Sequence, residues 1–309
     1  MFRLTPMRSG VFALTVAALA IWAGLGGFFA REMVAEIAIL AILALSLDLA
    51  AGFGGMVSLA HGAIMGVAAY GYVLACQAGL PPWPAAVVGI AAAALTGGLI
   101  GAVSARTQGI FFIMATLAFG QMIWTATFRS DALGGDNGMG GIPRPPLPLA
   151  DSGDPLVFAT YALLLLVAAF LLAAALLRSP FGRAMEAVRD NPARAAAIGL
   201  PPARIRATGF MLSSAVAGIA GVLAAQHIQF VSPELMVWTA SGEALVVLIL
   251  GGIGTLTGPV IGAAIFVVLK HWAAGWTDHW HLVIGALLIA VVLAGGRGIY
   301  GLIDRGRDA

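Results

Sequence analysis

Long apolar runs recur along nearly the whole chain, and they restrict its fold more than any other feature. Most of them have about 20 residues and few charges, the length that an α-helix needs to cross a bilayer. Only 10% of the 309 residues are charged, against roughly 25% in soluble domains, which indicates a surface that mostly faces lipid. The runs cover residues 10–30, 33–51, 57–77, 84–104, 109–128, 156–177, 207–230, 241–252, 257–273 and 281–296. We predict one domain over residues 1–309, an all-α, multi-pass membrane bundle with about ten membrane segments.

The first run admits a second interpretation. Arg3 and Arg8 followed by the apolar residues 10–30 resemble a secretory signal peptide. The run is long for the apolar part of such a peptide, however, and "FFAREM" is a poor cleavage site. We therefore expect an uncleaved first helix.

The basic residues predict the orientation of the bundle, because cytoplasmic loops carry an excess of Lys and Arg. With the N-terminus inside, twelve of the sixteen basic residues are cytoplasmic and four are external. The twelve are Arg3, Arg8, Arg106, Arg178, Arg183, Arg189, Arg194, Arg204, Arg206, Arg297, Arg305 and Arg307, and the four are Arg31, Arg129, Arg144 and Lys270. We predict that both termini lie in the cytoplasm and that residues 129–155 form an external loop.

Two glycine-rich breaks interrupt the apolar pattern, "GFGGMVSLAHGA" at 52–63 and "GGIGTLTGP" at 251–259. The second break folds residues 241–273 into two short segments, which returns the C-terminus to the cytoplasm. Broken segments at comparable places in two halves of a chain often mark a transport path. The alternative is that these glycines only allow close helix packing.

The chain lacks the residue sets of the common enzymes. No P-loop pattern is present, the only lysine is Lys270, and Cys76 is the only cysteine. The five histidines show no metal-ligand spacing beyond His279 and His281, which we interpret as residues at a membrane edge. We predict no catalysis, no metal site and no cofactor on this chain, and the placement of its arginines argues against nucleic-acid binding.

Residues 178–206 collect six arginines in one segment. Ser179 and Pro180 predict a helix start, Asn191 and Pro192 predict a break, and Gly199 predicts the end of a second short helix. We expect two short helices with Phe181, Met185, Val188 and Ile198 on an apolar face. On the polar face, Arg183, Glu186, Arg189 and Asp190 can form local ion pairs. An ordinary positive loop between two spans is the alternative.

This segment, "SPFGRAMEAVRDNPARAAAIGLP", resembles the cytoplasmic coupling loop of the permease subunits of ABC importers. Four further stretches are similar to branched-chain amino-acid permeases of the LivM type, and together with the coupling loop the resemblance covers about residues 35–300. They are "AGFGGMVSLAHGAIMGVAAY" at 51–70, "GIFFIMATLAFGQMI" at 109–123, "GGDNGMGGIP" at 134–143 and "SGEALVVLILGGIGTLTGPVIGA" at 241–263.

The resemblance implies a permease of the bacterial inner membrane that pairs with a second, homologous permease. Two cytoplasmic ABC ATPase subunits, which bind ATP and Mg, would drive it, and an extracytoplasmic binding protein would deliver the substrate. The residues expected to couple to the ATPase are Gly182, Glu186, Arg189, Asp190, Asn191 and Gly199. In the external loop we expect Asp136, Asn137 and Arg144 to meet the binding protein, unless the loop is only a solvated connector.

Several polar residues lie in or near the apolar spans, where a buried charge is expensive and usually faces protein or a cavity. They are Asp48, Ser58, His61, Gln121, Gln226 and Glu243. We expect His61 and Glu243 to lie beside the two breaks, and we expect Ser58, His61, Gln121 and Glu243 to line the path or the permease interface. The alternative is hydrogen bonding between helices without contact to substrate.

The predicted function is that of a permease subunit for branched-chain or other hydrophobic amino acids. Urea or short amides are alternative substrates within the same family. A stand-alone secondary transporter or channel is a third possibility, but it would need ion-coupling carboxylates in the membrane, and only Asp48 and Glu243 qualify.

Overall fold

The structure is a computed structural model that describes residues 6–146 and 152–276, together with single positions between 279 and 298. Its elements are α1 (Pro6–Leu25), α2 (Phe28–Asp48), the π-helical turn η1 (Leu49–Phe53), α3 (His61–Gln77), α4 (Pro82–Ser104), α5 (Ile110–Phe128), η2 (Asp131–Leu133), η3 (Gly135–Asn137), β1 (Met139–Gly140), α6 (Pro155–Arg178), α7 (Pro180–Asp190), α8 (Pro192–Ala197), α9 (Pro202–Ile228), β2 (Phe230–Val231), η4 (Pro233–Met236), α10 (Trp238–Gly251) and α11 (Gly258–Ala274). The helical architecture confirms the all-α prediction. The predicted last span at 281–296 lies for most of its length outside the described residues, and so do Arg297, Arg305 and Arg307.

Within the part of the chain that the structure describes, five helices are long and apolar enough to cross a membrane. They are α2 with η1, α4, α5, α6 and α9, and shorter apolar helices include residues 9–25, α10 and α11. The two glycine-rich breaks fall where the sequence predicts them, between η1 and α3 and between α10 and α11. Proline fixes several helix starts, since its ring pre-sets the helical φ angle and its missing N–H is not needed in the first turn. For this reason α9 begins at Pro202, earlier than the predicted span at 207.

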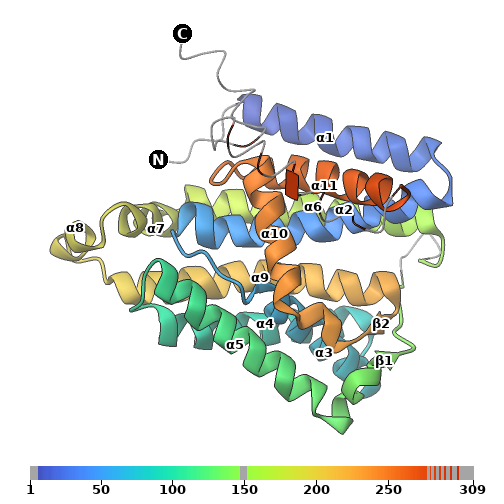
Figure 1. Cartoon of the computed structure of the whole chain (residues 1–309), viewed down its shortest axis with the longest axis horizontal. Helices are drawn as coiled ribbons and strands as arrows, with labels where there is room; N and C mark the ends of the chain where they lie inside the picture. Colours follow the sequence, from blue (N-terminus) through green and yellow to red (C-terminus); the bar gives the residue numbers. More distant parts are fainter. Residues whose placement is uncertain are drawn as a thin grey trace.

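Helices α2 and α9 form the centre of the bundle (Figure 1). Helix α2 packs against α6, α11, α9 and α10, and 83% of its most apolar stretch is buried. Helix α9 packs most extensively against α4 and also against α3. Helix α1 lies along the outer side of α2 and α6, where the rings of Phe12 and Phe170 stack with centroids 3.7 Å apart.

Glycines allow α3, α4 and α9 to approach each other closely. A Cβ atom at Gly97 of α4 would overlap the side chain of Ser214 of α9. A Cβ atom at Gly221 of α9 would overlap the backbone carbonyl of Met65 of α3. Small residues at such contacts let helix backbones pack tightly in a membrane, where dispersion forces and interhelical hydrogen bonds stabilise the contact.

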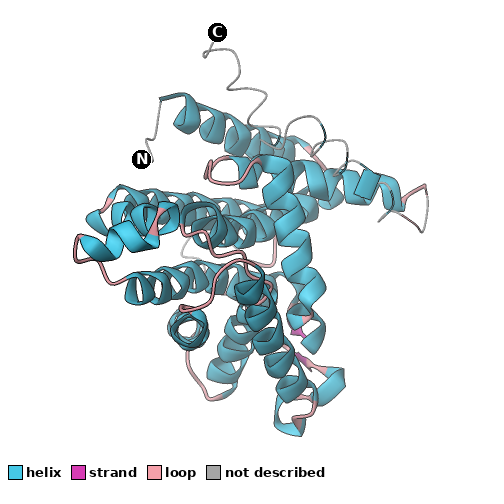
Figure 2. Ribbon diagram, turned by 60° about the vertical axis from the view of Figure 1, so that its left-hand side comes forward, coloured by secondary structure: helices cyan, strands magenta, loops and turns pink. Residues whose placement is uncertain are grey.

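The two ends of the bundle carry different structures. Helices α7 and α8 project at one end, and the strands β1 and β2 lie at the opposite end (Figure 1). The strands pair antiparallel, Met139 with Val231 and Gly140 with Phe230, which fastens the loop before α6 to the loop after α9. Figure 2 shows these two strands in magenta; among the described residues they form a two-stranded sheet in a molecule that is otherwise made of helices and loops.

Candidate functional site

The segment between α6 and α9 folds as the sequence predicts. The Ser179 hydroxyl accepts a hydrogen bond from the Gly182 N–H at 3.2 Å and caps α7. The Asn191 side chain accepts from the Arg194 N–H at 2.9 Å and caps α8. Both caps satisfy N–H groups that have no partner inside the helix. After α8, Gly199 adopts a left-handed conformation with φ +86° and turns the chain toward α9.

Helix α7 is pressed against the end of α6. A Cβ atom at Gly182 would lie 2.5 Å from the carbonyl oxygens of Leu176 and Leu177, so a side chain does not fit there. Met185 and Val188 are buried, which confirms their place on the apolar face, and Phe181 is half-buried. The prediction for Ile198 is wrong, since its side chain is 71% exposed. Ile198 follows the last residue of α8 and lies in the turn, so it does not continue the face of α7.

The polar residues of this segment separate into two groups. Glu186 is buried with an exposed fraction of 8%, whereas Arg183 and Arg194 are exposed. The predicted local ion pairing is confirmed for Arg189 and Asp190, whose Nη2 and Oδ1 atoms are 2.8 Å apart. The coupling roles of Gly182, Glu186, Arg189, Asp190, Asn191 and Gly199 stay predictions.

The two glycine-rich breaks lie against each other. Asp48, at the end of α2 and fully buried, accepts hydrogen bonds from the second break through both carboxylate oxygens. Its Oδ1 accepts from the Gly254 N–H at 2.6 Å and its Oδ2 from the Leu256 N–H at 3.0 Å. A Cβ atom at Gly52 would lie 2.7 Å from the Gly254 nitrogen, so the two backbones are in contact. Residues about 200 positions apart therefore form one structural unit.

His61 is the first residue of α3 and lies at the end of the first break, close to where it was predicted. Its Nε2 is 2.9 Å from the Ser213 hydroxyl of α9, which donates to the Ser46 carbonyl of α2. No hydrogen-bond partner lies within reach of the His61 Nδ1 among the described residues. Ser58 is also fully buried and accepts from the Ala60 N–H at 3.1 Å. In this chain, His61 therefore braces α2, α3 and α9.

The predicted position of Glu243 is wrong. Glu243 lies in the first half of α10, whereas the glycine-rich break follows the last residue of that helix, Gly251. The start of α10 lies instead beside the start of α3, because the Ser241 hydroxyl accepts from the Gly62 N–H at 2.8 Å. Glu243 and Gln121 of α5 are both half-buried. Whether either lines a path stays a prediction.

Arg144 holds the loop before α6 against the bundle. Its Nε and Nη2 donate to the carbonyls of Gln226 and His227 at the end of α9, each at 3.0 Å. Its Nη1 donates to the Ser152 carbonyl, and the guanidinium lies 4.4 Å from the Phe158 ring centroid. Gln226, fully buried, accepts from the Tyr161 hydroxyl at 3.2 Å.

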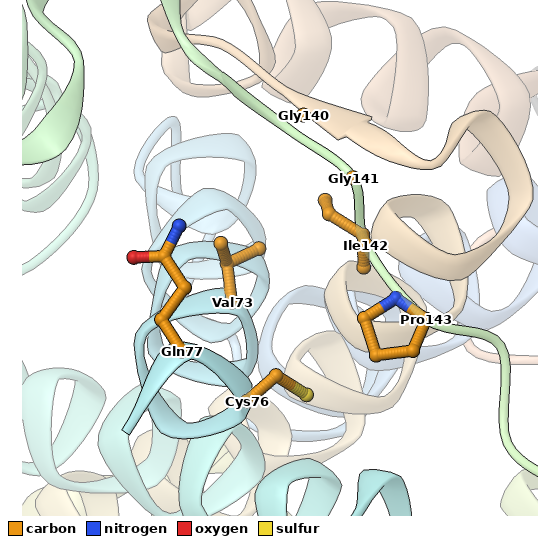
Figure 3. A pocket seen from close by; sticks show the side chains of 7 residues that line it. All are labelled: Val73, Cys76, Gln77, Gly140, Gly141, Ile142 and Pro143. Carbon is orange, nitrogen blue, oxygen red and sulfur yellow. The ribbon is translucent and has the colours of Figure 1, made fainter. Parts of the chain in front are cut away.

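Asp136 and Asn137 are exposed beside β1, at the same end of the bundle as Arg144. Contact of these three residues with a binding protein stays a prediction. A pocket of about 320 Å³ lies nearby, between the end of α3 and the loop after β1. Figure 3 shows Val73, Cys76 and Gln77 on one wall and the segment from Gly140 to Pro143 on the other.

Metal ligation finds no support in the described part of the chain, where no three His, Cys, Asp or Glu side chains are grouped closely enough to hold an ion. Three features of the site escaped sequence reasoning: the partners of Asp48, the use of Arg144 as a clamp, and a bond from Arg189 to Gly52, described below. A carboxylate inside an apolar span signals a buried partner, but nothing local identifies that partner.

Residues 29–292 match the family described as the permease component of the branched-chain amino acid transport system. The chain is 30% identical over 283 residues to the high-affinity branched-chain amino acid transport system permease protein LivM of Escherichia coli K12, a match that covers 84% of this chain and 67% of the relative. It is 33% identical over 125 residues to the permease protein LivH of Salmonella typhimurium, which covers 40% of each chain.

More distant similarities point to the same fold. The autoinducer 2 import system permease protein LsrC of Yersinia enterocolitica is 29% identical over 169 residues, which cover 49% of this chain and 45% of that protein. A solved structure described as an inward-facing, metal-chelate type ABC transporter superposes with a TM-score of 0.51 at 14% identity, covering 93% of this chain and 99% of that one. This likeness concerns the fold alone.

Proposed function

Because the chain belongs to the family of branched-chain amino acid transport system permease components, we propose that it forms the translocation path of an ATP-driven importer for branched-chain or other hydrophobic amino acids. One observation carries the proposal most directly. A capped, arginine-rich pair of short helices, α7 and α8, projects from one end of a membrane bundle, and the segment with β1 lies at the other end. This arrangement provides one docking surface on each side of a membrane.

The proposed assembly contains a second permease, two ABC ATPase subunits and an extracytoplasmic binding protein. The similarity to LivH, itself a permease of a branched-chain amino acid system, supports a homologous second permease. The exposed residues Arg183 and Arg194 suit contact with the ATPase subunits, and the exposed Asp136 and Asn137 suit contact with the binding protein. The absence of a P-loop pattern from the sequence supports ATP hydrolysis on separate subunits.

The proposed mechanism is alternating access. Closure of the ATPase dimer pushes α7 and α8. Because Gly182 has no side chain, α7 packs directly on the end of α6, and the push reaches α6 through this contact. Helix α9 follows α8 after a short turn at Gly199 and tilts with it. The outward cavity then opens to the docked binding protein, and release of ADP and phosphate resets the bundle.

The test is reconstitution of the complete importer in liposomes, with uptake of radiolabelled leucine, isoleucine and valine measured with and without ATP. We expect uptake that requires ATP, the ATPases and the binding protein. Urea, short amides and other amino acids serve as competitors, because LsrC is named for the import of a different compound and family membership does not fix the substrate. Uptake by this chain alone without ATP would overturn the proposal and support a stand-alone transporter.

Docking of the ATPase is tested separately by charge reversal at the exposed arginines. We expect Arg183→Glu with Arg194→Glu to reduce co-purification of the ATPase at least about tenfold, since charge reversal at an interface costs more than a kcal/mol. The matched control is Arg106→Glu, which changes an exposed arginine in the connection between α4 and α5. Unchanged co-purification of the ATPase would count against docking on α7 and α8.

A further inference from the structure

Arg189 has three hydrogen bonds that fix its guanidinium group. Its Nε and Nη2 donate to Asp190 Oδ1 at 3.0 and 2.8 Å, and its Nη1 donates to the Gly52 carbonyl at 2.6 Å. Asp190 thus orients the guanidinium so that its Nη1 reaches the Gly52 carbonyl in the first break. The side chain also lies directly over Gly55, where a Cβ atom would be 2.8 Å from the Arg189 Cγ. Helix α7 is therefore bonded to the π-helical turn η1, which is the end of the α2 rod.

The same turn is bonded to the second break on its other side. Asp48 precedes η1 by one residue and accepts from the N–H groups of Gly254 and Leu256. Leu256 has a left-handed φ of +64°, a conformation that costs a residue with a side chain about 1–2 kcal/mol. The hydrogen bond from its N–H to Asp48 helps to hold that conformation. Asp48 thereby fixes the shape of the connection between α10 and α11.

These contacts form an unbroken series from α7 through Gly52 and Asp48 to the second break. A displacement passed along these contacts would change the backbone conformation at the breaks first. Non-helical backbone bends more easily than a hydrogen-bonded helix, and hinges concentrate at the ends of secondary-structure elements. The backbones of Gly52 and Gly254 are in direct contact, so a displacement of the first break toward the second pushes against it.

We infer that Arg189 and Asp48 are positioning residues that transmit displacement of α7 to the second break, and so to α10 and α11. The inference rests on the proposed function, in which the ATPase subunits move α7. It gives Arg189 a role inside the chain, in place of direct contact with the ATPase. Displacement of the coupling segment then reaches the rest of the permease by three routes: through α6, through α9 and through the joined breaks.

The test follows the accessibility of Ile253, which lies within the second break and is 49% exposed. The Ile253→Cys variant is made with Cys76→Ser, since Cys76 is the only native cysteine of the chain. In the complete importer, the rate of maleimide labelling of this chain is measured without nucleotide and with ATP plus vanadate. We expect nucleotide to change the rate about fivefold or more, the lower range of coupling between distant sites.

Arg189→Gln and Asp48→Asn, each added to this background, should reduce the nucleotide effect to below roughly twofold. In Arg189→Gln the labelling rate without nucleotide and the co-purification of the ATPase should stay unchanged, which a merely structural defect would not allow. Asp48→Asn removes one acceptor from the second break, so its rate with nucleotide is compared with its own rate without nucleotide. Arg189→Lys should keep part of the nucleotide effect that Arg189→Gln loses. A lysine ammonium can donate to the Gly52 carbonyl, but it cannot make the paired hydrogen bonds of the guanidinium to Asp190. Arg106→Gln, an exposed arginine without a bond to either break among the described residues, is the matched control.

The double variant tests whether the two residues act in series. If they do, Arg189→Gln with Asp48→Asn changes the response no further than the stronger single variant, since members of one network are not additive. A full nucleotide response in Arg189→Gln, or losses that multiply in the double variant, would overturn the inference. The inference would also be overturned if nucleotide did not change the labelling rate of the background variant, Ile253→Cys with Cys76→Ser. In that case, co-purification of the ATPase and ATP-dependent uptake show separately whether the proposed function still holds.

Discussion

Helices α9 and α5 are nearly equally apolar and both are long enough to cross a membrane, yet they occupy opposite environments. Of the most apolar stretch, 67% is buried in α9 and 22% in α5. Helix α9 meets its neighbours with small residues, among them Gly209, Ser213, Ser214, Gly218 and Gly221, all buried or tightly contacted. Helix α5 exposes the large side chains of Ile110, Phe111, Met114, Met122 and Phe128. Hydropathy therefore predicts that a helix is in the membrane, and residue size predicts which of its faces meet protein.

The largest expected effect tests this comparison with one methyl group on each helix. Gly221→Ala in α9 places a Cβ atom on the Met65 carbonyl, so a helix backbone must move, and we expect a loss of about 3 kcal/mol or of the folded protein. Gly120→Ala in α5 has its nearest contact at 3.5 Å, and we expect a change within about 0.5 kcal/mol. Thermal unfolding in detergent measures both. Similar losses at the two positions would break the comparison.

An intermediate effect is expected from two neighbouring serines of α9 that are both fully buried. The Ser213 hydroxyl connects His61 of α3 to the Ser46 carbonyl of α2, so Ser213→Ala leaves a buried ring nitrogen without that partner and should cost about 1–2 kcal/mol.

Ser214 provides the control for this pair. Its hydroxyl donates to the Phe210 carbonyl of its own helix, and Ser214→Ala should cost less than about 0.5 kcal/mol. Equal costs in the same detergent assay would show that the contact between helices contributes no more than the bond within one helix.

The smallest effect is expected on the outer face of α5. Met122 is 65% exposed, and Met122→Ala should change the stability of the chain by less than about 0.5 kcal/mol, because lipid or detergent replaces the lost contacts. Unfolding of the chain in lipid nanodiscs is the measurement. A loss above about 1 kcal/mol would mean that protein covers this face of α5 in the membrane. The difference in burial between α5 and α9 would then hold only for the single chain.

Local rules predicted the coupling segment well. Ser179, Asn191 and Gly199 act at the helix ends where their residue types predict, because capping depends on atoms within three or four residues of the chain. The two glycine-rich breaks were found for the same reason, since they show as interruptions of apolar runs. The family resemblance is confirmed over most of the chain.

Long-range contacts escaped sequence reasoning. Asp48 was recognised as a charge inside an apolar run, but its partners, Gly254 and Leu256, are backbone N–H groups about 200 residues away and leave no signature of their own. Glu243 was expected beside the second break, but it precedes Gly251 by eight residues, and about two turns of α10 separate the two along the helix. Ile198 was assigned to a helical face that ends one residue before it.

Helix α9 has 27 residues and hence a length of about 40 Å. It starts just beyond the arginine-rich helices and finishes beneath the Arg144 clamp, which ties it to the loop at the far end. In the proposed orientation, this one helix joins the side of the ATPase subunits to the side of the binding protein. A rotation of the helix by 10° about its middle would shift its two ends by about 7 Å relative to each other. In the proposed assembly, docking of a loaded binding protein at the outer end of α9 would therefore displace its cytoplasmic end, just as movement of α7 and α8 by the ATPase subunits would displace its outer end.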